Sequence, residues 1–194
     1  MEKKTRLIST KQLTTTGILL AICIVSQYFK NLSIFITGPI INACIVMAVL
    51  TVNLPCAIIL SIITPITAYI LAASPVMMAV PAILVFIMLG NIVLAVTVFF
   101  LLKKDLTLPK KAAFNPLNMV KAVLCALAKG VFMGLTISLW LLPTFIPAES
   151  PLRGKMHVFQ TTFSLYQFIT ACIGFIYVFL ISYALRGKMT EAEN

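Results

Sequence analysis

Acidic side chains are scarce in this 194-residue chain, which has five carboxylates and one histidine against fifteen lysines and arginines. None of the carboxylates lies inside a long apolar stretch, and neither does the histidine. Paired-carboxylate catalysis, HExxH zinc sites and intramembrane proton relays all need such groups at depth. The sequence therefore disfavours an acid-coupled pump, and we predict no catalytic residue, no metal site and no cofactor.

Charged residues of both signs are also few, at 10% of the chain, whereas hydrophobic residues make up 61% and the mean hydropathy is +1.08. A soluble domain usually carries about 25% charged residues. Apolar stretches recur from Leu13 to Leu185, which leaves too little sequence for a separate soluble domain. We predict a single all-α integral membrane domain over residues 1–194.

A nucleotide-binding loop of the form G-x-x-x-x-G-K-[ST] is missing, so the chain is not expected to use ATP by itself. The net charge of +10 could suggest a nucleic-acid partner. Most of the basic residues, however, stand at the ends of apolar segments, where they orient a membrane protein. We therefore predict a lipid bilayer as the surroundings of this chain and no nucleic-acid partner.

Six segments approach the roughly 20 apolar residues that a membrane-spanning helix needs. A short turn over residues 52–55 separates the second from the third. Three prolines, Pro39, Pro55 and Pro81, fit first helical turns, where a missing N–H costs little. Pro65 lies inside the third segment and predicts a kink there. The six predicted spans are Leu13–Phe29, Pro39–Leu54, Cys56–Ala73, Pro81–Leu102, Met119–Leu142 and Phe163–Leu185.

The basic residues predict the orientation of these spans. An even number of spans places both termini on one side, and ten lysines and arginines flank that side against three on the other. Positive residues favour the cytoplasmic side, so we predict a cytoplasmic N-terminal segment (1–11) and tail (186–194). We expect the first span to be retained, because Ile22 before Cys23 does not fit the small residue of a lipoprotein cleavage site.

Lys129 lies near the middle of the fifth predicted span, where no acid can neutralise it. One interpretation is that Lys129 recognises a carboxylate or phosphate on a small ligand. The other is that it extends along its stem toward the cytoplasmic face. That face is about 15 Å away at 1.5 Å per residue, which is far for one side chain.

Other polar residues fall in the predicted outer halves of the spans. Thr136 and Trp140 follow Lys129 at helical spacing, and Gln160, Ser164 and Gln167 share a face at the start of the last span. Asn42 lies in the outer half of the second span, and Asn91 lies in the middle of the fourth. Together these residues predict a pocket open to the outside. The alternatives are that Trp140 belongs to an interfacial aromatic belt and that each amide only bonds a neighbouring helix.

The chain resembles a known family, the substrate-binding S components of energy-coupling factor (ECF) transporters, over residues 11–186. Lys11-Gln12-Leu13 leads into a helix whose Gly17 and Ala21 have small-xxx-small spacing. The remaining segments of the resemblance follow in order: Gly38-Pro39-Ile40-Ile41-Asn42, Thr64-Pro65-Ile66-Thr67-Ala68, Gly90-Asn91-Ile92 and the string from Ser164 to Gly174.

The resemblance implies a division of labour. S components capture a vitamin, a vitamin precursor or a similar micronutrient from outside, and deliver it with a transmembrane coupling subunit and two ATPase subunits. In the family, small residues on the first helix contact the coupling subunit, and Gly17 and Ala21 match them here, with Val25 where a further small residue is expected. The resemblance also implies a multi-pass protein of a bacterial-type plasma membrane.

Two other function classes remain open. A stand-alone secondary carrier would be expected to show an ion-coupling acid or a two-fold internal repeat, and we find neither. A membrane enzyme would need a nucleophile with a base, and His157, in a predicted outer loop, is better explained as a solvated residue. The substrate itself is not identified by any residue pattern.

Overall fold

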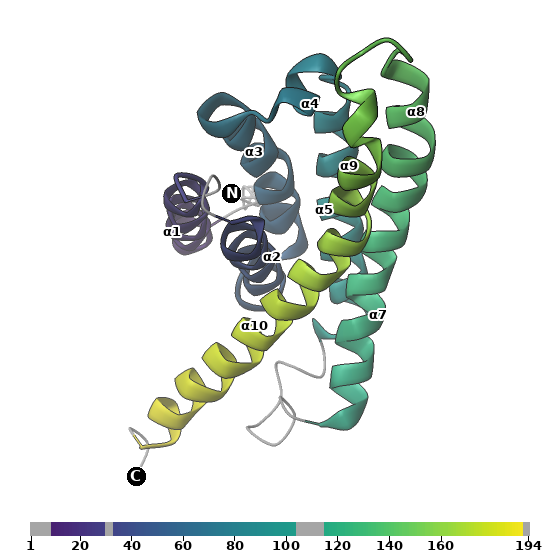
Figure 1. Ribbon diagram of the computed structural model, residues 1–194. Helices are drawn as coiled ribbons and strands as arrows, with labels where there is room; N and C mark the ends of the chain where they lie inside the picture. Colours follow the sequence, from purple (N-terminus) through teal and green to yellow (C-terminus); the bar gives the residue numbers. More distant parts are fainter. Residues whose placement is uncertain (1–8, 30–32, 104–114, 192–194) are drawn as a thin grey trace, which may run out of the picture.

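The computed structural model describes residues 9–29, 33–103 and 115–191, with side chains as far as residue 184, and every regular element in these ranges is helical (Figure 1). The elements are α1 (Thr10–Gln27), α2 (Ile34–Thr51), α3 (Leu54–Ala72), α4 (Pro75–Ala79), α5 (Ile83–Leu101), α7 (Pro116–Met133), η2 (Gly134–Leu141), α8 (Leu142–Phe145), η3 (Arg153–Lys155), α9 (Met156–Phe163) and α10 (Leu165–Glu191).

Five helical segments of the described chain are long and apolar enough to cross a membrane. They are α2, α3, α5, the continuous run Pro116–Phe145 that comprises α7, η2 and α8, and the run Arg153–Ala184 that includes α9 and most of α10. The chain is therefore compatible with a multi-pass membrane protein. Helix α1 is not among the five, because Lys11, Gln12 and several threonines make its first turns polar. Five of the six predicted spans correspond to these segments, and the first, which lies in α1, does not.

The orientation remains a prediction. Most of the basic residues that carry it fall in residues 1–8, 30–32 and 104–114, outside the described residues, and the side chains of Arg186 and Lys188 are outside them too.

Pro55 and Pro39 occupy different positions in their helices. Pro55 occupies the first turn of α3 as predicted, directly after Asn53, whose Oδ1 accepts a hydrogen bond from the Cys56 N–H at 2.8 Å. The prediction for Pro39 was wrong: α2 begins five residues earlier, at Ile34 after the Ser33 cap, so Pro39 lies inside the helix. The Ser33 hydroxyl accepts a hydrogen bond from the Phe35 N–H at 3.1 Å, and a cap of this kind stabilises the start of the helix.

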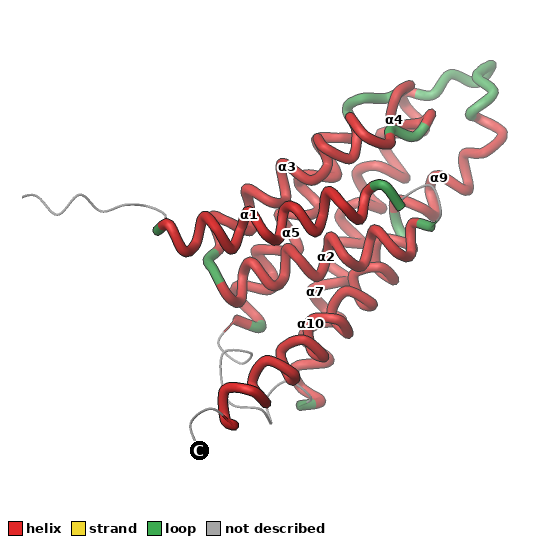
Figure 2. The backbone as a smooth tube through the Cα atoms, turned by 90° about the vertical axis from the view of Figure 1, so that its left-hand side faces the viewer, coloured by secondary structure: helices red, strands yellow, loops and turns green. Residues whose placement is uncertain are grey.

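The long helices run side by side as a bundle, with α4 and α9 at one end and the C-terminus toward the other (Figure 2). Helices α2 and α10 approach closely because glycines lie between them. A Cβ at Gly174 would stand only 2.9 Å from the Cβ of Asn42 and 3.0 Å from the Pro39 carbonyl oxygen, and one at Gly38 would stand 2.9 Å from the Thr170 side chain. Small residues of this kind let helices pack tightly in lipid.

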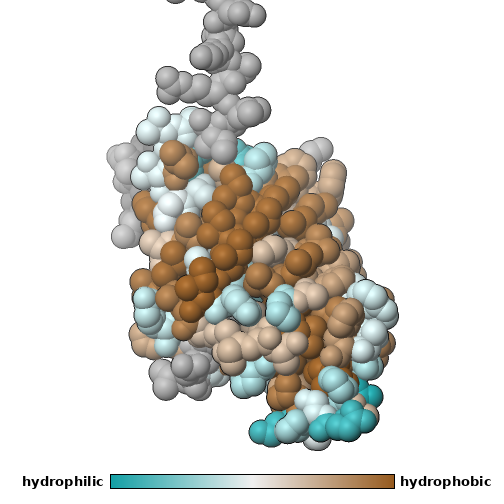
Figure 3. Space-filling model, turned by 90° about the horizontal axis from the view of Figure 1, so that it is seen from above, coloured by the Kyte–Doolittle hydropathy of each residue, from teal (hydrophilic) through white to brown (hydrophobic). Residues whose placement is uncertain are grey.

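Two apolar clusters fill the bundle at different depths. The larger one contains Ile45, Leu60, Leu94, Cys125 and Phe175, and lies toward the end where α2, α5 and α10 finish. The smaller one, which contains Met77, Ile83, Met133, Leu141 and Phe163, lies toward the end that carries α4, α8 and α9. Figure 3 shows the molecule from that end: apolar residues cover much of the visible surface, and the most hydrophilic ones gather at one edge.

Candidate functional site

A cavity of about 200 Å³ lies between the two apolar clusters and is bounded by residues of α2, α3, α4, α5, α7, α9 and α10. Its lining is mostly apolar, with a few polar side chains among the apolar ones, as is usual for small-molecule sites. The lining residues are Ile34, Thr37, Gly38, Ile41, Asn42, Thr64, Pro65, Ala68, Ser74, Met77, Ile87, Asn91, Lys129, Thr162, Phe163 and Gln167.

Lys129 is the central polar group of this cavity. Its side chain is 2% exposed, and its Nζ donates hydrogen bonds to Asn42 Oδ1 at 2.6 Å and to Asn91 Oδ1 at 2.7 Å. The three residues come from α7, α2 and α5, so the interaction joins three separate helices. The lysine stem therefore does not run to either surface of the bundle; it ends at the cavity.

The two asparagines are held in a fixed orientation by this lysine. Because both side-chain oxygens face Nζ, both amide nitrogens point away from it. Asn42 Nδ2 donates a long hydrogen bond of 3.4 Å to Thr170 Oγ1, which in turn donates to the Gln167 carbonyl at 3.2 Å. Among the described residues no hydrogen bond from Asn91 Nδ2 is present, and Asn91 lines the cavity.

The cavity is thus rich in donors. A lysine amine has at most three N–H bonds, and two of them go to the asparagine oxygens. The third N–H of Lys129 and the amide of Asn91 are left for something inside the cavity. The best-placed acceptor oxygens, those of Asn42 and Asn91, are already occupied by Lys129. This arrangement suits a ligand group that accepts hydrogen bonds.

The larger apolar cluster seals the cavity on one side. On each helix the cluster residues begin within one turn of the polar residue: Ala126 precedes Lys129, Leu94 and Ala95 follow Asn91, and Ala43 follows Asn42. All of them are 6% exposed or less. This side of the cavity is therefore closed, and residues at the end that carries α4 and α9, such as Met77 and Phe163, line the opposite side.

The structure brings together four of the eight residues predicted to bind a substrate, and these are Lys129, Asn42, Asn91 and Gln167. Thr136 and Trp140 lie outside the cavity. The Thr136 hydroxyl donates to the Phe132 carbonyl of its own helix at 2.7 Å. Trp140 is 53% exposed and packs edge-on against Phe86 and Phe145, with ring centroids 5.8 and 6.5 Å away.

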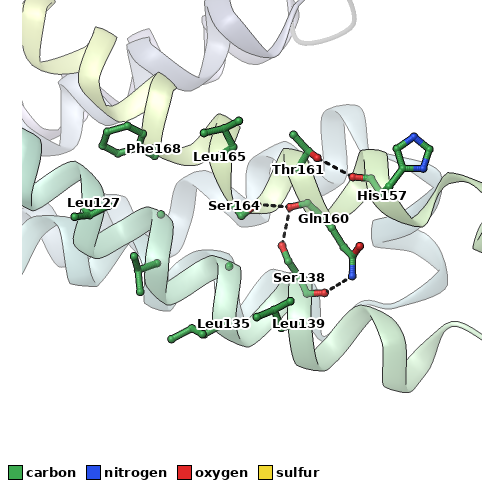
Figure 4. A pocket seen from close by; sticks show the side chains of 13 residues that line it. Leu127, Leu135, Ser138, Leu139, His157, Gln160, Thr161, Ser164, Leu165 and Phe168 are labelled. Atoms are coloured by element: carbon green, nitrogen blue, oxygen red, sulfur yellow. Dashed lines mark hydrogen bonds between the residues drawn. The ribbon is translucent and has the colours of Figure 1, made fainter.

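The other two predicted residues, Gln160 and Ser164, line a separate groove on the side of the bundle (Figure 4). Gln160 Nε2 donates to the Ser138 carbonyl at 3.0 Å, and the Ser138 hydroxyl donates back to the Gln160 carbonyl at 2.8 Å. The Ser164 hydroxyl donates to that same carbonyl at 2.6 Å. These side chains join η2 to α9 at the point where α9 ends and α10 begins.

Several polar residues around the cavity were missed by sequence reasoning. Thr37, Thr64, Ser74 and Thr162 line it, and Thr170 supports Asn42. Thr170 follows Gln167 by three residues and so shares its helix face, which was a usable signal. The other threonines gave no such signal, because a hydroxyl in a membrane helix usually donates to a carbonyl of its own helix. The Thr64 hydroxyl, for example, donates to the Leu60 carbonyl at 2.8 Å.

The small residues of α1 are exposed. Gly17 has no atom of another residue within 4 Å of where a Cβ would stand, and Ala21 borders a shallow apolar hollow between α1 and α2. The described part of the chain supplies no helix packed on Gly17. A partner from another molecule stays a prediction.

Comparisons of this chain with protein-family models, with curated proteins and with solved structures found no match.

Proposed function

We propose that this chain is a membrane protein that captures a small solute carrying a carboxylate or a phosphate, and that it does so as the S component of an ECF-type importer. The observation that carries the first part is the buried amine of Lys129, which at the wall of a cavity meets two amide oxygens and, among the described residues, no carboxylate. A buried cation without a counter-charge is costly, and an anionic ligand would supply that charge.

The size of the cavity limits the solute. Its volume of about 200 Å³ is below the roughly 300–1,000 Å³ of typical ligand pockets. Apolar residues such as Ile41, Met77 and Ile87 line much of the remaining wall. The solute is thus small and partly apolar, with its acidic group toward Lys129, which fits a vitamin precursor or a similar micronutrient.

The importer role rests on further inferences. The sealed side beyond Lys129 supports binding from one side of the membrane only. With α1 as a sixth span and both termini in the cytoplasm, the open side faces outward. The missing nucleotide-binding loop then requires ATPase subunits from outside this chain, and the exposed Gly17 and Ala21 offer a surface for a coupling subunit.

The first experiment is to purify the chain from native membranes in mild detergent and to identify retained small molecules by mass spectrometry. We expect one acidic solute, retained by the wild type and lost from Lys129→Met. Losing a hydrogen bond to a charged group costs about 1.5–3 kcal/mol, or roughly 10- to 150-fold in affinity.

A matched control is Lys11→Met, which removes an exposed lysine outside the cavity. If both variants retain the solute equally, Lys129 does not bind it and the capture proposal is wrong. Co-purification of ATPases with the wild-type chain would support the importer. Uptake by the purified chain alone, reconstituted in liposomes, would instead identify a stand-alone carrier.

A further inference from the structure

A groove separate from the Lys129 cavity lies on the lateral surface of the bundle (Figure 4). The groove has a volume of about 590 Å³ and runs between α7–η2 and α9–α10, apart from the cavity that holds Lys129. Both of its walls belong to segments long and apolar enough to cross a membrane. We propose that it holds one acyl chain of a membrane phospholipid whose anionic headgroup lies at the His157 end.

One wall of the groove is a regular apolar stripe. Leu127, Val131, Leu135 and Leu139 follow one another at four-residue spacing, and their side chains are 45%, 49%, 58% and 67% exposed. From the first to the last, twelve residues at 1.5 Å each give a length of about 18 Å. Half of a bilayer's hydrocarbon core is about 15 Å, so the stripe extends over about one leaflet.

The opposite wall is close at the bottom of the groove. A Cβ at Gly130 would stand 2.8 Å from the Phe168 Cβ, and one at Gly134 would stand 3.2 Å from the Ser164 Cβ. The two glycines therefore form a narrow floor where α7 and α10 meet, and Leu165 and Phe168 line the far side. Larger residues at either position would collide with α10 or push it away.

The narrow floor favours an acyl chain as the occupant. An α-helix with side chains is at least about 10 Å across, whereas a single extended hydrocarbon chain is much thinner. An acyl chain can therefore follow the stripe and reach the floor at Gly130 and Gly134.

Polar groups gather at one end of the groove only. His157 and Thr161 line that end, and its other hydrogen-bonding groups, in Ser138, Gln160 and Ser164, already bond one another. The exposed residues Arg153 and Lys155 directly precede α9, and the single acid of that loop is Glu149. Arg153 Nη1 donates hydrogen bonds to the Pro143 carbonyl at 3.2 Å and to the Ile146 carbonyl at 3.0 Å, and these bonds hold the loop in place. Lys155 and His157 are left to meet a phosphate at headgroup depth.

The test counts tightly bound lipid by native mass spectrometry after exchange into phosphatidylglycerol or phosphatidylcholine. We expect the wild type to retain one phosphatidylglycerol. Val131→Trp and Leu139→Trp fill the groove and should each lose it. The control is Leu124→Trp on the same helix, at a 50% exposed position outside the groove. Two groove variants are used so that the test still stands if one of them misfolds. The wild type and the three variants must all remain monodisperse in size-exclusion chromatography.

The headgroup part has its own measurement. Each basic side chain near an anionic surface contributes about fivefold in binding, so Lys155→Gln should weaken phosphatidylglycerol retention by about that factor. Equal retention of phosphatidylcholine and phosphatidylglycerol by the wild type would overturn the proposal, as would a groove variant that keeps its lipid. Lys129→Met should retain the lipid, so this outcome is independent of the function proposed for the cavity.

Discussion

At the scale of single residues, Lys129 and its two asparagines form a donor site in which the lysine determines what the amides can do. Each asparagine directs its oxygen to Nζ, at 2.6 Å from Asn42 and 2.7 Å from Asn91. The amide nitrogen of Asn91 is then available to the cavity. An acid in place of either asparagine would give Lys129 an internal counter-charge, and this possibility provides a direct test of the ligand's sign.

We expect Asn91→Asp to bind the retained solute more weakly than Asn91→Ala does. The aspartate keeps the volume of asparagine but pairs with Lys129 and repels an anion, whereas alanine removes one donor to the ligand and one acceptor of Lys129 and adds no charge. Removing one neutral hydrogen bond costs about 0.5–1.5 kcal/mol, so Asn91→Ala should weaken binding by roughly 2- to 13-fold. Isothermal titration calorimetry on purified protein measures both, and an aspartate variant that binds at least as well as the alanine variant would point to a cationic or neutral ligand.

For Trp140, in contrast to Asn91, we predict that a substitution leaves solute binding nearly unchanged. It was predicted to bind substrate, yet its indole ring lies on the outer surface between Phe86 and Phe145, and no part of it lines the cavity. We expect Trp140→Phe to change solute affinity by less than about twofold, in the range of ordinary surface substitutions. The same titration measures it. A large loss would mean that α7 and η2 rotate when the ligand binds.

The sequence could identify the buried lysine and the amides because unpaired polar groups are rare in membrane helices. It could not distinguish Gln167, which reaches the cavity, from Gln160 and Ser164, which do not. An ideal helix continued through all three would place them on one face. The actual chain breaks at Ser164, where φ is −118° and ψ is −82°, so the residues on either side of it face different spaces.

At the scale of helices, the close approach of α2 and α10 positions the site. Gly174 meets α2 at Asn42, Pro39 and Ala43, and Asn42 is one of the two residues that hold Lys129. Glycine is needed at position 174 because it has no side chain. Backbone conformation is not the reason, since the described residues include no glycine with a positive φ. Packing at Gly174 and geometry at Lys129 are therefore linked.

We expect Gly174→Leu to lower stability by about 1–3 kcal/mol, the usual cost of overpacking, and to weaken solute binding as α2 shifts. The cost follows from contacts with backbone atoms of α2, which cannot rotate away: 3.0 Å to the Pro39 oxygen and 3.2 Å to the Ala43 nitrogen. Thermal unfolding in detergent measures the stability. The matched control is Gly17→Leu on α1, where nothing lies within 4 Å, and equal melting temperatures of the two variants would contradict this account.

Helix positions were largely predictable, because apolar runs of this length have few other stable forms in lipid. The π-helical turns of η2 over Gly134–Leu141 were not, because no residue pattern there differs from an ordinary α-helix. Irregular turns of this kind often accompany functional sites. Here η2 forms one wall of the lateral groove, and its Ser138 bonds Gln160 across the groove.

At the scale of the whole molecule, the open question is whether α1 crosses the membrane. Five segments qualify by length and apolarity, and α1 lacks only a hydrophobic start. Its 18 residues extend about 27 Å, close to the roughly 30 Å of a bilayer core. It also packs into the bundle, since Gln27, fully buried at its end, donates to the Thr64 carbonyl at 3.0 Å. The polar start would then lie in the cytoplasmic headgroup region.

Labelling in intact cells distinguishes the two topologies. Gly154→Cys introduces a thiol at an exposed position between η2 and α9, and Thr10→Cys introduces one at the exposed start of α1. If α1 spans and the termini are cytoplasmic, a membrane-impermeant maleimide should label position 154 in intact cells and position 10 only after permeabilisation. The unmodified chain is the control, because its five native cysteines are buried or half-buried. Labelling of both positions from outside would mean that α1 lies on the outer surface. The chain would then have five spans, and the surface formed by Gly17 and Ala21 would not be available to a coupling subunit within the bilayer.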